Sequence, residues 1–231
     1  MADTKTFFIG QWDTFHNNGP FDTGILYDLR LERSENLPSV IERYNDAAEE
    51  VQQLIQSCIS NNERFRAYGS GWSLSDIAHQ KDRMLYTGRM NLKMPIKQED
   101  LHAASNYLAE DLFFFQCGTT IKEISEFVSS AGKSLKTSGA SNGQTIAGSI
   151  STGIHGSAFD TGAVQDYVAG LSLIIGPGPN DLVYLERHTR SALNDAFAMK
   201  IKSRVIRNEG LFNAALVGFG SLGFIHGVTL E

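Results

Sequence analysis

Residues 69–73, with the sequence GSGWS, form the segment whose residue types point most directly to chemistry. They follow the run RFRAY at 64–68, whose alternation is typical of a β-strand. Glycines let a backbone approach a ligand closely, and consecutive N–H groups in such a loop can form a concave site for an anion. The segment therefore indicates a phosphate or other anion site, and the alternative is an ordinary tight turn of small residues.

A second segment, residues 137–157, consists mainly of Gly, Ala, Ser and Thr. A run of this composition is typical of a flexible linker. Ile146, Ile150 and Ile154 nevertheless recur every four positions through it, a pattern that a solvated linker does not require. We therefore expect a short, closely packed helix flanked by tight turns.

A third glycine-rich segment, residues 218–223, formally matches the dinucleotide fingerprint G-x-G-x-x-G. That fingerprint needs a strand before it, a helix after it and an acidic residue about 20 positions later. Here a strand-like run follows at 224–230. The context therefore argues against a nicotinamide site of the Rossmann type.

The composition narrows the classes of function. With 231 residues, 42% of them hydrophobic, the chain can form a packed core, and its net charge of −6 argues against a broad nucleic-acid surface. No apolar run approaches the ~20 residues of a membrane helix, and residues 1–13 lack a signal-peptide pattern, so the expected compartment is the cytoplasm. Cys58 and Cys117 lack motif spacing, and we predict two reduced, buried cysteines and no metal ion.

The first half of the chain predicts a strand at 25–31, a helix at 45–59 and a strand at 64–68. The helix is expected because its apolar residues fall three and four positions apart, with Glu and Gln between them.

The next unit opens with an aromatic-rich strand at 112–118. Thr120 and Glu123 have the spacing of a capping box at the start of a helix, and Gly132 suits a left-handed position at its end. The sequence therefore predicts a helix of about three turns between them.

The C-terminal part predicts a hairpin from 166–175 and 182–186 around the turn GPGPND. We expect the charged segment 187–208 to be helical and to face the surface. Residues 211–230 predict a turn of apolar helix, a glycine loop and a closing strand at 224–230.

Strands and helices alternate, but hairpins are also present, so the predicted fold class is α+β. Residues 91–110 separate the two units and mark the expected boundary. We therefore expect two lobes, residues 1–95 and residues 96–231.

Three stretches together, RAYGSGWSLSD at 66–76, residues 113–174 and residues 211–230, carry a resemblance to a known family. They resemble the FAD-binding domain of the vanillyl-alcohol oxidase and p-cresol methylhydroxylase (PCMH-type) superfamily, especially its sugar-lactone and alditol oxidases. The resemblance implies a two-lobed α+β domain that holds FAD between its lobes.

The resemblance also implies which residues contact FAD. The first loop would wrap the pyrophosphate, the second segment would follow the pyrophosphate, ribityl chain and flavin edge, and the third would contact the adenine side. The residues so assigned are Tyr68, Gly69, Ser70, Gly71, Trp72 and Ser73, then Ser138, Gly139, Gln144, Thr145, Gly148, Ser149, Thr152, Gly153, His155 and Gly156, then Phe224 and Ile225.

Two histidine questions follow from the resemblance. Family members with covalently bound flavin commonly carry histidine where this chain has Trp72, so the resemblance implies non-covalent FAD. His155 has the side-chain type of a general base, but its glycine-bounded turn favours a role in orienting the loop or touching the cofactor. We assign no catalytic residue, and we expect His226 to be packed or solvated.

The resemblance implies oxidation of an alcohol, sugar lactone or hydroxy acid by hydride transfer to flavin N5. Family members continue into a separate substrate domain, whereas this chain ends at Glu231, so most substrate contacts are expected outside it. Two alternatives stay open: a flavin-dependent reductase of the enolpyruvyl-sugar type, and a non-catalytic FAD-binding module that needs a partner chain. The substrate, the electron acceptor and the oligomeric state stay open as well.

Overall fold

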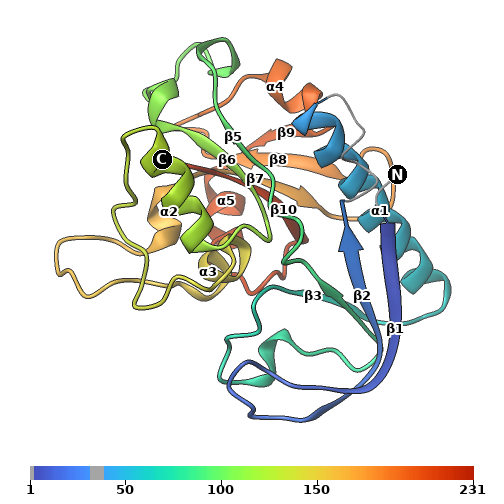
Figure 1. Cartoon of the computed structure of the whole chain (residues 1–231). Coiled ribbons are helices and arrows are strands. Elements are labelled where there is room, and N and C mark those ends of the chain that lie inside the picture. The colour runs from blue at the N-terminus through green and yellow to red at the C-terminus, as the bar shows by residue number, and fades with distance from the viewer. Residues whose placement is uncertain (1–2, 32–38) are drawn as a thin grey trace.

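The computed structural model describes residues 3–31 and 39–231, which form two β-sheets with helices packed against them (Figure 1). The smaller sheet has the strand order β1-β2-β4-β3, and the larger has the order β5-β6-β10-β7-β8-β9. Both sheets mix parallel and antiparallel neighbours. The α+β class is therefore confirmed.

The smaller sheet combines a hairpin with two short parallel strands. Strands β1 (Asp3–Trp12) and β2 (Phe21–Arg30) pair antiparallel, and β4 (Arg83–Tyr86) lies parallel between β2 and β3 (Phe65–Tyr68). The predicted strands at 25–31 and 64–68 are confirmed with shifted ends. Sequence analysis did not predict β1, most of whose residues are exposed and so show no clear alternation.

Helix α1 (Val40–Ser60) joins the two sheets. Its apolar stripe is confirmed, but the helix begins five residues before the predicted start, because the side chain of Ser39 caps it by accepting from the N–H of Glu42. One hydrophobic cluster contains Val51 of α1 together with Leu85 of the smaller sheet and Tyr184 of the larger one. Packing on this helix therefore fixes the sheets relative to each other.

The larger sheet carries the segments that sequence analysis placed as strands in the second half. The closing strand β10 lies between β6 and β7 and pairs antiparallel with both, so the last segment of the sequence is central in the sheet. Its strands are β5 (Lys93–Pro95), β6 (Phe113–Gln116), β7 (Val168–Ile174), β8 (Leu182–Glu186), β9 (Arg204–Arg207) and β10 (Phe224–Leu230).

Helices α2 (Ile121–Ser130), α3 (Ile146–Thr152) and α5 (Glu209–Ala215) contribute to a second hydrophobic cluster with the larger sheet. The capping box of Thr120 and Glu123 is confirmed, with both reciprocal hydrogen bonds present. Short 3-10 turns cover Asp76–Ala78, Gln98–Asp100, Ala109–Asp111 and Val164–Tyr167.

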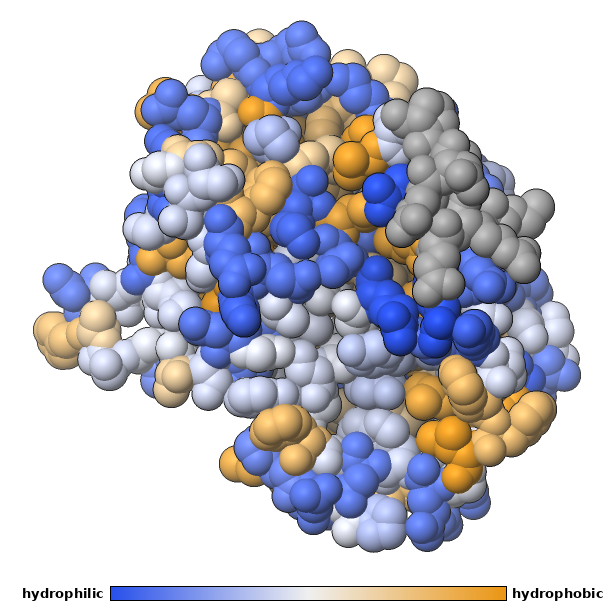
Figure 2. Space-filling view, in the orientation of Figure 1, coloured by the Kyte–Doolittle hydropathy of each residue, from blue (hydrophilic) through white to orange (hydrophobic). Residues whose placement is uncertain are grey.

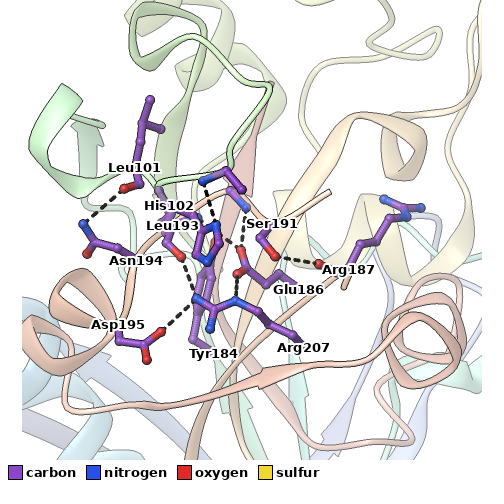
Figure 3. Close-up of polar contacts among 12 residues, drawn as sticks. Leu101, His102, Tyr184, Glu186, Arg187, Ser191, Leu193, Asn194, Asp195 and Arg207 are labelled. Carbon is purple, nitrogen blue, oxygen red and sulfur yellow. Dashed lines mark hydrogen bonds and ion pairs between the residues drawn. The ribbon is translucent and has the colours of Figure 1, made fainter. Parts of the chain in front are cut away.

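The expectation of a surface helix over 187–208 is wrong. This segment contains only a short helix, α4 (Asp195–Lys200), and then strand β9, which pairs parallel with β8. Arg207 of this segment has a buried partner: the fully buried carboxylate of Glu186 accepts from Arg207 Nε at 2.8 Å and from two backbone N–H groups, those of Ala192 and Leu193 (Figure 3). A charged residue can therefore be placed against the interior when the neighbouring strand provides its partner.

The surface is mixed, with apolar side chains gathered over the β1–β2 hairpin, where Phe8 is strongly exposed (Figure 2). Cys58 and Cys117 are free and buried, as predicted. Within the described residues, no helix combines the length and apolar composition that crossing a bilayer requires. The change from the smaller to the larger sheet falls between β4 and β5, and the division into lobes at residues 95 and 96 stays a prediction.

Candidate functional site

A cavity of about 1090 Å³ is lined by residues of both sheets and of α3. Its walls come from the loop 69–73, from the segment 144–154 and from residues 219–225, which are the three glycine-rich segments of the sequence. Ligand pockets in proteins typically measure about 300–1,000 Å³, so the cavity has room for a large cofactor. Three segments far apart in sequence thus meet at one site.

The cavity brings together two thirds of the predicted contact residues. Those that line it are Tyr68, Gly69, Ser70, Gly71, Trp72, Ser73, Gln144, Thr145, Gly148, Thr152, Phe224 and Ile225. Those outside its lining are Ser138, Gly139, Ser149, Gly153, His155 and Gly156.

The residues outside the lining have local structural roles. Ser149 is fully buried on α3, and its hydroxyl donates to the carbonyl of Thr145 at 2.9 Å. Gly153 ends α3 in the left-handed conformation. His155 contacts the carbonyl of Gly156 through Nδ1 at 2.9 Å, so its ring is engaged with its own loop. Contact of these residues with FAD stays a prediction.

The loop 69–73 presents backbone N–H groups that the protein itself does not use. Strand β3 ends at Tyr68, and Gly71 has a φ of +66°, a conformation that favours glycine. The carbonyl of Gly71 accepts from the N–H of Phe15 at 2.8 Å, which holds the loop in place. No described residue accepts a hydrogen bond from the N–H groups of residues 70–73. Unpaired backbone N–H groups in a loop that lines a cavity suit an anion.

Trp72 forms part of the cavity wall. Its ring stacks on that of Phe15, with centroids 4.5 Å apart and planes inclined by 14°. A Cβ added to Gly143 would lie 2.7 Å from Trp72 Cζ2, so the indole packs directly on that backbone. The hydroxyl of Ser70 donates to the carbonyl of Gly143 at 2.5 Å. The first two glycine-rich segments are therefore in direct contact.

Thr145 positions the second wall. Its hydroxyl accepts from the N–H of Gly148 at 3.4 Å and caps α3, the short helix predicted from the isoleucine spacing. Ile146 and Ile150 are fully buried, while Gly148 and Thr152 line the cavity. The helix thus turns its apolar side to the core and its small residues to the cavity.

The third wall confirms that residues 218–223 are not a Rossmann fingerprint, because strand β10 follows them. The loop is anchored to α3: the N–H of Val217 donates to the carbonyl of Ile150 at 2.9 Å, and that of Phe219 to Ser151 at 3.3 Å. These bonds hold the glycine loop against the cavity.

Sequence analysis missed several lining residues. Arg66 lies on β3 within the predicted strand at 64–68, and the signal for it was a charged residue in an alternating run that leads into the glycine loop. Ile55, Cys58 and Ile59 reach the cavity from the end of α1, and no local pattern distinguishes them from other core-facing positions.

Burial raises the pKa of ionisable groups at the cavity, among them Cys117 and Tyr68. Cys117 lines the cavity, and burial raises the pKa of its thiol to about 12, so the thiol is protonated at neutral pH. Burial likewise raises the pKa of the Tyr68 hydroxyl to about 12. His226 lies outside the lining, fully packed against Tyr44, and burial lowers its pKa to about 4. In the described residues, no three His, Cys, Asp or Glu side chains are grouped to hold a metal ion.

Comparison with known proteins identifies a family to which the chain is similar. The FAD binding domain family matches residues 44–179. The chain is 26% identical to D-arabinono-1,4-lactone oxidase of Debaryomyces hansenii over 187 residues. The aligned region covers 79% of this chain and 30% of that protein. It is 25% identical over 185 residues to L-gulonolactone oxidase of Bos taurus, covering 80% of this chain and 35% of that protein. The chain therefore spans about a third of the length of these relatives.

Solved structures share the fold. Cholesterol oxidase from B. sterolicum superposes with a TM-score of 0.63 at 11% identity, covering 99% of this chain and 37% of that one. The VAO-type flavoprotein MtVAO615 from Myceliophthora thermophila C1 gives 0.60 at 15% identity, covering 90% and 32%. Since the family match covers more than half of the chain and includes two of the three cavity walls, this protein belongs to the FAD binding domain family.

Proposed function

We propose that the cavity binds one FAD per chain. The observation that supports this most directly is the loop 69–73, which lines the cavity and whose N–H groups at residues 70–73 have no acceptor among the described residues, so that they suit the FAD pyrophosphate. Gly148 and Thr152 on α3 would lie along the middle of the cofactor, and Phe224 and Ile225 on its adenine side. The cavity also contains a buried side-chain oxygen, Gln144 Oε1, for which no described residue supplies a donor.

The proposed activity of the whole protein is oxidation of a sugar lactone, alcohol or hydroxy acid. This rests on the relatives, which are named as lactone oxidases. When bound, FAD supplies flavin N5 as the acceptor of a hydride. The residues of this chain bind and orient the cofactor and exclude water from its buried side. The relatives do not favour a reductase, and substrate contacts are proposed to come mainly from outside this chain.

We further propose that FAD is held without a covalent bond. Trp72 lines the cavity with an indole, which offers no nucleophilic nitrogen comparable to imidazole. Cys58 and Cys117 are both buried thiols at the cavity, and burial raises the pKa of both, that of Cys117 to about 12, so each is a poor nucleophile at neutral pH. A cytoplasmic location stays a prediction from composition alone.

Titration of the purified chain with FAD tests the proposal. Binding should perturb flavin absorbance and fluorescence, reach one equivalent and raise the melting temperature, because the ligand binds only the folded state. Gly71→Val and Gly148→Val should abolish binding while leaving the circular dichroism spectrum folded. Gly210→Ala, on α5 and outside the cavity lining, is the matched control that should bind as wild type does. Well-folded wild-type protein that shows no interaction with FAD would overturn the proposal.

A further inference from the structure

One charged side chain that lines the cavity, that of Arg66, has no ion-pair partner among the described residues. Among the described residues, Arg66 is the only Lys or Arg that lines it, and Glu63 is the only Asp or Glu. The carboxylate of Glu63 is already paired with Arg83. Arg66, by contrast, forms no ion pair with any described residue. The cavity therefore contains a cation whose charge the protein does not balance.

The guanidinium of Arg66 has one hydrogen bond through Nη2, while its Nε has no acceptor among the described residues. Its Nη2 donates to the carbonyl of Phe219 at 3.0 Å, which ties β3 to the loop of the third wall. Its Nε is buried, and no described residue accepts a hydrogen bond from it. Burial lowers the pKa of this side chain, which means that its charge is held at a cost in solvation. An anionic ligand at this position would offset that cost.

Arg66 is also close in sequence to the loop 69–73. Gly69 lies three positions after it, directly beyond the end of β3, a span of about 10 Å at ~3.3 Å per residue. Since Arg66 and the loop 69–73 line the same cavity, its guanidinium and the N–H groups of the loop can act on one extended, doubly charged group.

Building on the proposed FAD site, we propose that Arg66 recognises the diphosphate of the ADP half of FAD. In this arrangement the loop 69–73 contributes backbone N–H donors, and Arg66 contributes the only Lys or Arg side chain that the described part of the chain places in the lining. Recognition of the cofactor then depends on its phosphates as well as on the flavin ring. The chain should accordingly bind FAD and ADP through Arg66, whereas riboflavin, which lacks phosphate, should not depend on this residue.

The test measures binding of FAD, ADP and riboflavin to the wild-type chain, Arg66→Gln and Arg66→Lys by calorimetry. Arg66→Gln should weaken FAD and ADP about ten- to hundredfold, the range expected for hydrogen bonds to charged groups, and should change riboflavin affinity less than about twofold. Arg66→Lys should recover part of the loss. Added salt should weaken ADP binding more steeply in wild type than in Arg66→Gln.

Arg64→Gln is the matched control, because Arg64 is exposed, lies two residues away and is outside the cavity lining. It should bind all three ligands as wild type does. Equal loss of FAD and riboflavin in Arg66→Gln would show that Arg66 merely positions the Phe219 loop, and unchanged ADP and FAD affinities would show that it has no role; either result overturns the inference. Wild-type protein that binds ADP through Arg66 but gains nothing from the flavin would instead refute the proposed FAD site and support the phosphate site.

Discussion

Gly69 and Thr145 are in direct contact although 76 positions separate them: a Cβ built on Gly69 would lie 2.1 Å from Thr145 Oγ1 and 2.7 Å from its Cγ2. Gly69 begins the loop 69–73, and Thr145 caps α3. The absence of a side chain at Gly69 thus lets the first and second walls of the cavity meet.

Gly69→Ala should therefore displace Thr145 and separate these walls. We expect a loss of about 1–3 kcal/mol in the free energy of unfolding, the usual cost of overpacking, together with a marked loss of FAD affinity. Urea unfolding and FAD titration measure the two effects. Gly210→Ala is the control, because its added Cβ would lie an ordinary 3.5 Å from Asn208 Oδ1 and falls within a helix. A Gly69→Ala protein with wild-type stability and affinity would show that the contact relaxes freely.

The buried histidine of β10 predicts a pH dependence of stability. Burial lowers the pKa of His226 from 6.5 to about 4, so the folded state favours the neutral ring, whose Nε2 donates to the carbonyl of Tyr44 at 3.1 Å. The contribution of His226 to stability is complete above pH 6.5 and is lost as the pH falls from there to about 4. The total loss corresponds to about 3 kcal/mol.

His226→Gln keeps a donor for Tyr44 without an ionisable ring, so its free energy of unfolding should fall less steeply than that of wild type across this pH range. Urea unfolding at several pH values between these limits measures the difference. His16→Gln, which removes an exposed histidine, is the matched control. Parallel pH curves for wild type and His226→Gln would contradict the prediction.

The buried ion pair that holds β9 to β8 should be important for stability. Glu186→Leu leaves the guanidinium of Arg207 and the N–H groups of Ala192 and Leu193 without the buried carboxylate (Figure 3). Breaking one partner of a buried pair typically costs about 3–5 kcal/mol. Asp195→Asn removes the more exposed partner of the same guanidinium and should cost less than about 1 kcal/mol. Similar melting temperatures for the two variants would argue against this prediction.

Attachment of the flavin can be tested by denaturation. Precipitating the FAD-loaded chain with acid should release all flavin into the supernatant, because neither Trp72 nor the buried thiols of Cys58 and Cys117 offer a suitable nucleophile. Mass spectrometry of the pellet should give the mass of the unmodified chain. Flavin that stays in the pellet and adds its mass to the polypeptide would refute non-covalent binding.

The sequence by itself determined the elements whose signals are local. The stripe of α1, the capping box of Thr120 and Glu123 and the isoleucine spacing of α3 each lie within a few turns of chain, and all three are present in the structure. The glycines of the loop 69–73 could also be interpreted from the sequence alone, because the conformational freedom of the backbone is a property of glycine itself.

Only the tertiary structure decided the features whose partner lies far away in sequence. Strand β1 is stabilised by its pairing with β2, because its own sequence shows no clear alternation. The charged segment 204–207 forms a strand because it pairs with β8 and because Arg207 forms an ion pair with the buried Glu186. The position of Arg66 in the cavity depends likewise on Phe219, 153 residues later. Burial of a charge or pairing of a strand depends on the free energy of the contact formed, and that contact exists only once chain segments far apart in sequence have come together.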